Sequence, residues 1–250
     1  MTLSRIATLA GTAMALLCAA VPSTAAAGGL AISPATIERE AKPGSIGSVR
    51  VTNGASKTLR ITVSARPWIQ SRNGAVRPND TRRLSQIKLG VTAFTLAPGQ
   101  VRSVPASLLS RPSSGSLYGT ISVIGTVVGA SSSNGVTARY RLLAGLRLNP
   151  STARRSLRAV VGSARYSGGT TRIGVRNAGN TVEPISGSAT VSGPSGTRRV
   201  SITAQRIVPG ATVDLRLPHG RLQAGRYTIA LRLDQGGRRV ATVTRSVRVR

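Results

Sequence analysis

Side chains that could do acid–base, nucleophilic or metal chemistry are scarce in this 250-residue sequence. It has one His, one Cys and six acidic residues against 35 Lys and Arg, which gives a formal net charge of +29. One Cys and one His are too few to complete a zinc site. So few carboxylates also disfavour paired-carboxylate catalysis and Ca²⁺ sites. We therefore expect a protein that is not an enzyme and has no catalytic residues, no cofactor and no metal.

The single histidine, His219, stands in the segment Leu217-Pro218-His219-Gly220, which has the composition of a turn. No Gly-x-Ser-x-Gly nucleophile elbow occurs in the sequence, and nothing fixes a nucleophile beside this imidazole. A lone histidine in a turn is more often a surface residue than a catalytic base. We expect a surface position for His219, and a hydrolase that uses it is the enzymatic alternative.

The single tryptophan offers a candidate binding site. Trp68 lies in the segment Ala65-Arg66-Pro67-Trp68-Ile69-Gln70, at the end of an expected strand. One interpretation is core packing on the third strand of a β-sandwich. The other is a platform for a sugar ring, with Arg66 and Arg72 beside it and Pro67 favouring a sheet edge. Our candidate ligand-binding residues are therefore Arg66, Trp68 and Arg72.

Arginine alternates with apolar residues in several segments, among them Val49-Arg50-Val51, Leu215-Arg216-Leu217, Leu231-Arg232-Leu233 and Val247-Arg248-Val249. On a strand this alternation puts Arg on the solvated face and Val or Leu on the buried face. A net charge this large attracts polyanions. The one Trp, four Tyr and one Phe are scattered singly, not interleaved with basic clusters, so no specific nucleic-acid binding is expected.

The N-terminus has the organisation of a secretory signal peptide, which we place at residues 1–27. Arg5 precedes an apolar run over residues 6–21, and the small residues 24–28 provide an A-x-A-like cleavage site. This order predicts a secreted, extracytoplasmic protein that is associated with the cell envelope.

The single cysteine, Cys18, lies inside this leader. Lipid attachment to Cys18 is the lesser alternative, because the bulky Leu17 precedes it. After cleavage the chain has no disulfide, so its domains must be held by their cores. No later segment reaches the roughly 18 apolar residues of a membrane-spanning helix, and we expect no transmembrane anchor.

From residue 30 onward the sequence predicts β-strands. Short runs rich in Val, Ile, Thr and Leu alternate with Gly, Pro, Asn and Ser, and no window keeps the spacing of an amphipathic helix. The expected strands of the first half cover residues 30–37, 46–52, 59–68, 89–96, 101–108, 117–128 and 136–148. Those of the second half cover residues 158–166, 171–176, 185–191, 199–204, 212–217, 226–233 and 240–249. This pattern predicts an all-β fold with two tandem immunoglobulin-like β-sandwich domains.

Three landmarks recur in the same order in both halves of the chain. They are an Asn/Gly turn after a strand, a Pro-Gly turn before a strand, and a Tyr at the start of a late strand, where a tyrosine corner would sit. The landmarks fall at Asn53, Pro98 and Tyr118 in the first half and at Asn177, Pro209 and Tyr227 in the second. Because Pro150 breaks the long strand that ends before it, we place the two domains at residues 28–148 and 149–250.

Several motifs of the first half are shared with known families. They are Ile32-Ser33-Pro34, Val51-Thr52-Asn53, Ala97-Pro98-Gly99-Gln100, Leu117-Tyr118-Gly119-Thr120-Ile121, Gly135-Val136-Thr137-Ala138-Arg139-Tyr140 and Gly145-Leu146-Arg147-Leu148. This set resembles the peptidoglycan-binding domain of the WxL-interacting, DUF916-type surface proteins, and it is also similar to the N-terminal immunoglobulin-like domain of PapD-type pilus chaperones. The second half is similar to a generic bacterial immunoglobulin-like repeat. DUF916-type proteins normally carry a C-terminal membrane helix, of which this sequence shows no sign.

Two functional hypotheses follow. The first is a non-enzymatic cell-envelope binding or adaptor protein that contacts anionic cell-wall polymer, such as peptidoglycan, or a surface protein. The alternative, implied by the resemblance, is a periplasmic-type pilus or surface-protein assembly chaperone that acts by donor-strand pairing. A chaperone of this kind needs an exposed sheet edge and a basic pair that captures the partner's C-terminal carboxylate. Arg39 or Arg139 is a candidate member of such a pair, and the large number of arginines leaves the pair itself open.

Overall fold

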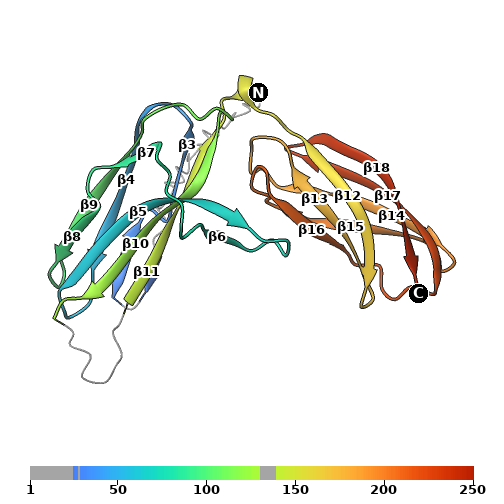
Figure 1. Ribbon diagram of the computed structural model, residues 1–250, viewed down its shortest axis with the longest axis horizontal. Coiled ribbons are helices and arrows are strands. Elements are labelled where there is room, and N and C mark those ends of the chain that lie inside the picture. Colours follow the sequence, from blue (N-terminus) through green and yellow to red (C-terminus); the bar gives the residue numbers. More distant parts are fainter. Residues whose placement is uncertain (1–24, 28, 130–138) are drawn as a thin grey trace, which may run out of the picture.

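The computed structural model describes residues 25–27, 29–129 and 139–250, which form two β-sandwiches joined by a short linker (Figure 1). The strands of the first sandwich are β1 (Ala25–Ala27), β2 (Leu30–Ser33), β3 (Thr36–Glu40), β4 (Gly44–Asn53), β5 (Leu59–Gln70), β6 (Val76–Pro78), β7 (Ile87–Leu89), β8 (Ala93–Leu96), β9 (Val101–Leu108), β10 (Leu117–Val127) and β11 (Arg139–Asn149). Those of the second are β12 (Ala159–Ser167), β13 (Thr170–Asn177), β14 (Ile185–Gly193), β15 (Gly196–Gln205), β16 (Thr212–Leu217), β17 (Gly225–Gln235) and β18 (Arg238–Val249). A 3₁₀ turn, Thr152–Arg154, lies in the linker.

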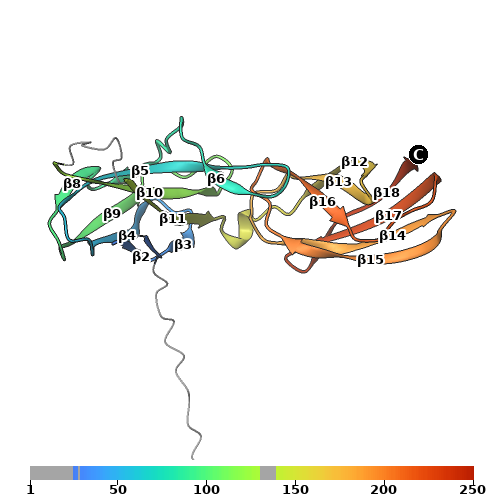
Figure 2. The same cartoon turned by 90° about the horizontal axis from the view of Figure 1, so that it is seen from below.

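The first sandwich consists of two sheets that face each other across a hydrophobic core (Figure 2). One sheet has the order β1-β2-β4-β9-β7, and the other has the order β3-β11-β10-β5-β6 with β8 paired to β5. Alternate side chains of each strand point inward, as the period of two predicts, and Val51, Ile61, Ile121 and Leu146 are fully buried between the sheets. The predicted all-β sandwich is therefore confirmed.

The second sandwich has the same two-layer organisation with fewer strands. A sheet of order β12-β13-β16 packs on a sheet of order β15-β14-β17-β18. Its core is a separate hydrophobic cluster, in which Ile173, Ile185, Leu217 and Ile229 are fully buried. Each sandwich thus has its own core, and we propose the two sandwiches as the domains predicted at residues 28–148 and 149–250.

Two predicted strands are wrong, because the chain changes sheets within them. The strand predicted at 30–37 is divided into β2 and β3, which lie in opposite sheets, and Pro34 follows β2 where it cannot donate a ladder hydrogen bond. The strand predicted at 89–96 is divided into β7 and β8, also in opposite sheets, with Gly90 between them. Residues 136–138 of the predicted strand 136–148 lie outside the described residues.

The repeated Asn and Pro-Gly landmarks form the same turn structure in both sandwiches. Asn53 is fully buried, and its Nδ2 donates to Lys57 O and Leu96 O, both at 2.9 Å. Asn177 is also fully buried, and its Nδ2 donates to Thr181 O and Ile207 O, both at 2.7 Å. In each case the second acceptor lies two residues before the Pro-Gly pair. A buried amide therefore ties one turn to another in each half.

The tyrosine landmarks are not equivalent, and the expected tyrosine corner is found in one half. Tyr227 is buried in the core of the second sandwich, and its hydroxyl donates to Gln223 O at 3.1 Å, as in a tyrosine corner. In contrast, Tyr118 lies on the opposite face of its strand from the core residues Leu117 and Ile121. Because side chains alternate along a strand, a one-residue offset between the two motifs puts the two rings on different faces.

Candidate functional site

The last strand of the first sandwich, β11, has one edge that is half covered. Its C-terminal half pairs in parallel with β3, and on this side Gly145 donates its backbone N–H to a carbonyl oxygen just before β3 at 2.8 Å. Backbone groups alternate along a strand, so those of Arg139, Arg141 and Leu143 point to the same side. In the part of the chain that the structure describes, no strand pairs there with residues 139–144, which we call the free half of β11.

The side chains of the free half alternate between core and solvent. Leu142 and Ala144 are buried in the core, whereas Leu143 is 40% exposed and Arg139 is exposed. Arg141 lies on the outer face and pairs with Asp80 at 2.5 Å. The free half therefore presents unpaired backbone groups together with one apolar and two basic side chains.

The loop after β6 is held on the outer face of the sheet by this ion pair. The hydrogen bond from Arg141, with further help from the charges of Arg66 and Arg77, holds the pKa of Asp80 below its usual value. Both members of the pair are at least one-third exposed, so its contribution to folding stability is small. The pair positions the loop beside β11 more than it stabilises the fold.

Strand β1 lies at the same side of the first sandwich as β11. It pairs with β2 and lies near β11 without forming a ladder with it. Its residues, Ala25–Ala27, belong to the predicted leader 1–27, and the preceding residues of that leader are outside the described part of the chain.

Arg39 and Arg139 do not form a basic pair. Arg39 lies on β3 opposite Leu148, whereas Arg139 lies opposite Thr126 at the other end of β11. At about 3.3 Å per residue, roughly 30 Å of strand separates the two positions. One carboxylate cannot reach both guanidinium groups.

The turn between β5 and β6 connects the first sandwich to the second (Figure 1). The side-chain amide of Gln70 donates to Arg206 O at 3.0 Å and accepts the N–H of Val208 at 2.8 Å. Asp214 donates its N–H to Arg72 O at 2.7 Å, and the two side chains form an ion pair at 2.8 Å. Since β16 is an edge strand, this turn covers part of the edge that β16 would otherwise expose.

A second contact between the sandwiches is centred on Asn180. Its Nδ2 donates to Ser114 O at 2.8 Å, and its backbone carbonyl accepts the Tyr118 hydroxyl at 3.2 Å. The Tyr118 ring stacks on Trp68 with 6.4 Å between ring centroids, and burial raises the pKa of Tyr118. Together with the turn at Gln70, this contact fixes the angle between the two sandwiches at two separate points.

The three predicted ligand-binding residues are engaged by different parts of the protein. Arg66 donates to Ser64 Oγ at 3.1 Å and to backbone carbonyls of the loop after β6. Half-buried Trp68 packs on Tyr118 outside the main core cluster, and Arg72 is paired with the second sandwich. Six residues of nearly extended chain, about 20 Å, separate Arg66 from Arg72. A saccharide site formed by all three stays a prediction.

The prediction that His219 is a surface residue is wrong. The side chain is 5% exposed, its Nε2 lies 2.8 Å from Thr171 Oγ1, and its ring stacks on Tyr166. The turn folds back on the sandwich, and the His219 side chain is therefore buried between the turn and the sandwich. Both ring nitrogens have structural partners, since Nδ1 lies 2.7 Å from Gly220 O.

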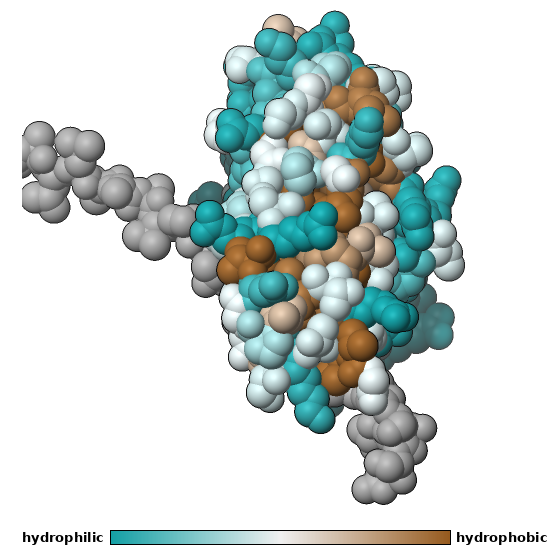
Figure 3. Space-filling model, turned by 90° about the vertical axis from the view of Figure 1, so that its left-hand side faces the viewer, coloured by the Kyte–Doolittle hydropathy of each residue, from teal (hydrophilic) through white to brown (hydrophobic). Residues whose placement is uncertain are grey.

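The remaining surface offers weaker candidates. The end of the first sandwich that points away from the second shows apolar patches separated by polar and charged side chains (Figure 3). Val101 and Leu109 are exposed by 52% and 57%, and single exposed apolar residues of this kind are ordinary. Within the described ranges, no group of three His, Cys, Asp or Glu is placed to hold a metal ion, and no helix has the length and apolarity to cross a membrane.

Comparison with known proteins supports the fold. No protein-family model and no curated protein matches the sequence, so the resemblance to the DUF916-type proteins stays a prediction. Among solved structures, a chain of a chaperone–tip adhesin complex from CFA/I fimbriae biogenesis is 14% identical, with a TM-score of 0.51 over 87% of this chain and 98% of that chain. At this identity the likeness shows a shared PapD-like fold.

Two further solved structures are similar over most of their length. The class 5 fimbriae chaperone CfaA is 14% identical over 88% of this chain and 99% of its own, with a TM-score of 0.49. The structure of the Salmonella enterica SafA pilin in complex with the SafB chaperone contains a chain that is 13% identical, with a TM-score of 0.47 over 86% of this chain and 94% of that chain.

Proposed function

We propose that this protein is an exported, non-enzymatic assembly chaperone that binds a surface-protein subunit by adding a strand to the free half of β11. The unpaired edge at residues 139–144 carries this proposal, because it continues the line along which β3 already pairs with β11. An extended segment of a partner placed there would extend the sheet beyond β11.

The chemistry of the free half suits such a partner. Main-chain hydrogen bonds give affinity in strand addition, and alternate side chains give specificity. Leu143, 40% exposed, would enter an apolar groove of the subunit, with the exposed Arg139 near one end of the added strand. The PapD-like fold agrees with this function, since one structure of that fold comes from a chaperone–tip adhesin complex.

Removal of the predicted leader would make the free half of β11 more accessible. Cleavage after residue 27 takes away β1, which lies near β11. In this proposal the exported form of the protein has a more accessible edge than the precursor.

The test uses a substitution that removes one edge donor. Leu143 directs its N–H away from β10, so Leu143→Pro deletes a donor toward the partner and leaves the β10 ladder intact. We expect the tagged wild type to capture one or a few subunits from native envelope extract in fixed stoichiometry, and the L143P variant to capture at least tenfold less.

The matched control is Leu143→Thr, which keeps the N–H and reduces the apolar surface. Capture by L143T should fall by less than capture by L143P. If L143P, with an unchanged thermal midpoint, captured the same subunits in the same ratio, strand addition at β11 would be refuted.

A second candidate function is binding to anionic wall polymer, and it is favoured by the net charge of +29 and by the exposed arginines of both sandwiches. If these charges act collectively, sedimentation with purified wall polymer should weaken smoothly as salt is added, because exposed charges are screened beyond about 8 Å at physiological ionic strength. Salt-independent sedimentation would exclude this mechanism.

A further inference from the structure

Three arginines form a row across the outer face of the sheet β12-β13-β16. The strand register puts Arg165 directly opposite Arg172, and Arg172 directly opposite Arg216. All three side chains are exposed on the same face, because the neighbouring residues Ile173 and Leu215 point into the core. Like charges directly opposite each other destabilise a sheet, so this row costs stability in the absence of a counter-ion.

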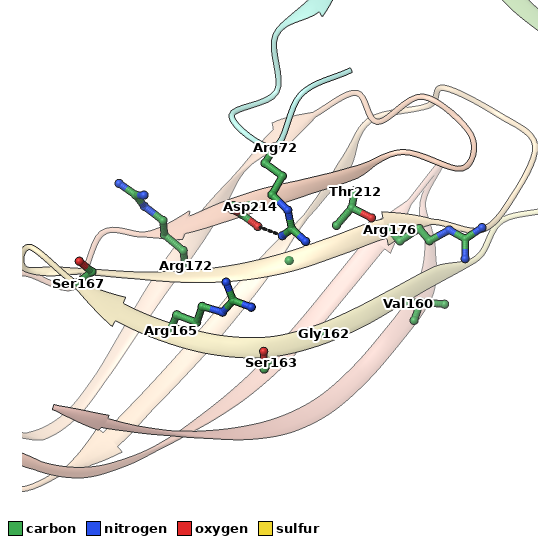
Figure 4. A pocket seen from close by; sticks show the side chains of 11 residues that line it. Arg72, Val160, Gly162, Ser163, Arg165, Ser167, Arg172, Arg176, Thr212 and Asp214 are labelled. Carbon is green, nitrogen blue, oxygen red and sulfur yellow. Dashed lines mark hydrogen bonds and ion pairs between the residues drawn. The ribbon is translucent and has the colours of Figure 1, made fainter. Parts of the chain in front are cut away.

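The row borders a shallow bowl that both sandwiches build. The bowl has a volume of about 330 Å³, and its lining includes Arg72, Arg165, Arg172, Arg176, Thr212 and Asp214. In Figure 4, Arg72 from the first sandwich and Arg165 from β12 reach into the same space above β13, with Arg172 and Arg176 extending on either side.

Two glycines keep this bowl open. Gly162 lies at the irregularity where the β12–β13 register shifts, and Gly174 lies beneath Arg72. A Cβ on Gly174 would meet Arg72 Nη1 at 3.4 Å, an ordinary van der Waals contact, so a side chain larger than that of Ala would extend toward the guanidinium. Behind the bowl, Arg245 donates to Gly162 O at 2.8 Å and to Val161 O at 2.6 Å, which fixes the irregular segment.

The protein has little negative charge left to neutralise these arginines. Five of the six acidic residues form ion pairs with other arginines or, in the case of Asp214, with Arg72. Among the described residues, no carboxylate lies within ion-pair distance of Arg165, Arg172 or Arg216. Four guanidinium groups therefore line the bowl against one carboxylate that is already paired.

We propose that this face binds a phosphate-type oxyanion that carries more than one anionic group, through the Arg165–Arg172–Arg216 row and the adjoining Arg72 and Arg176. Planar guanidinium groups suit phosphoryl oxygens because they donate two parallel hydrogen bonds. The row spans about 10 Å across three strands, so a chain of phosphates fits it better than a single phosphate. The site is independent of the β11 edge.

The test compares two matched pairs of arginines on the second sandwich. Arg165→Ala/Arg172→Ala removes one cross-strand pair from the bowl, and Arg226→Ala/Arg248→Ala removes an exposed cross-strand pair on the opposite sheet with the same change in charge. Tripolyphosphate, with inorganic phosphate as the single-anion probe, is titrated calorimetrically at fixed ionic strength.

We expect saturable binding of tripolyphosphate by the wild type, a loss of at least tenfold in affinity for R165A/R172A, and a change of less than twofold for R226A/R248A. Inorganic phosphate should bind more weakly than tripolyphosphate. The affinity of Arg165→Lys/Arg172→Lys for tripolyphosphate should lie between that of the wild type and that of R165A/R172A, because the lysines keep the charge and lose the planar donors.

Folding is checked in the same series. The thermal midpoint of R165A/R172A should be no lower than that of the wild type, since two opposed charges are removed. Tripolyphosphate should raise the midpoint of the wild type and raise that of R165A/R172A less. Equal losses of affinity in the two double variants, or no saturable binding by the wild type, would overturn the proposal.

Discussion

The last strands of the two sandwiches, β11 and β18, each pair with the strand before them, but their outer edges differ. β10 pairs with β11, and β17 pairs with β18, in long antiparallel ladders. Arg245 of β18 donates hydrogen bonds to two backbone carbonyls of β12 and so connects the two sheets of the second sandwich. The free half of β11 has no comparable tie among the described residues. β18 also ends its sheet, so the difference lies between an edge strand whose Arg245 side chain is bonded to the facing sheet and the free half of β11, which our proposal assigns to a partner strand.

The two landmark tyrosines, Tyr118 and Tyr227, also have different structural roles. In the second sandwich, Tyr227 is a core residue whose hydroxyl is bound by Ser195 and Gln223. Tyr118 of the first sandwich instead lies between Trp68 and Asn180, where it connects the two sandwiches. A similar motif thus places one tyrosine in the core of the second sandwich and the other at the contact between the two sandwiches.

The largest expected effect tests what the sandwiches share. Asn53→Ala and Asn177→Ala each remove three side-chain hydrogen bonds, at least one of them buried, and leave carbonyl groups unpaired, so each should cost about 3 kcal/mol of unfolding free energy. Denaturant unfolding would measure both, with exposed Asn73→Ala as the control. A loss for one variant without the other would break the equivalence of the two halves.

Replacing the tyrosines should separate the two uses. Tyr227→Phe leaves the buried ring and removes its hydroxyl bonds, at a cost of about 1 to 2 kcal/mol in the stability of the second sandwich. Tyr118→Phe should change the stability of each sandwich less and should increase cleavage of the linker in limited proteolysis. The comparison fails if Y118F destabilises the first sandwich as much as Y227F destabilises the second.

The contact at the β5–β6 turn should affect orientation more than stability. Gln70→Ala removes two hydrogen bonds to the second sandwich and should widen the distribution of angles between the sandwiches, as seen by small-angle scattering. Exposed Val76→Ala, opposite Gln70 in the same hairpin, is the control. An unchanged scattering profile for Q70A would show that the Arg72–Asp214 and Asn180 contacts hold the angle without Gln70.

The smallest effect concerns pH. The folded-state pKa of Asp80 lies below its usual value of 3.8, so the stabilisation from its pairing with Arg141 is present above that value and is lost as the pH falls through the folded pKa. The protection of the loop amides after β6, taken relative to the exchange rate of unstructured chain at the same pH, should therefore fall below about pH 4. Asp80→Asn should show the faster exchange at neutral pH, and a loop that behaves identically in D80N would contradict this role.

Much of the fold could be predicted from the sequence, because period-two runs between Gly, Pro and Asn turns report directly on half-buried strands. The strands at 101–108 and 212–217 have the predicted bounds. The change of sheets at Pro34 and the burial of His219 could not be predicted, since both depend on how distant strands pack.

The site was harder to predict for the same reason. Gln70 and Asn180 join the sandwiches through contacts with residues far away in the chain, and no local pattern marks them. β3 pairs with the C-terminal half of β11 and leaves the other half open. This depends on how the strands pair, not on the composition of the sequence. The arginine row could have been found only with the register of β12, β13 and β16, because Arg165, Arg172 and Arg216 lie in separate alternating segments.

Hydrogen exchange of a captured complex tests directly whether a partner strand is added to the free half of β11. With the subunit that the wild type captures from envelope extract, amide exchange is compared between the free and the bound protein along β11 and β18. We expect the amides of Arg139, Arg141 and Leu143 to become protected in the complex while β18 is unchanged, because a strand has been added to the free half of β11. Unchanged exchange at these three amides in a saturated complex would contradict it.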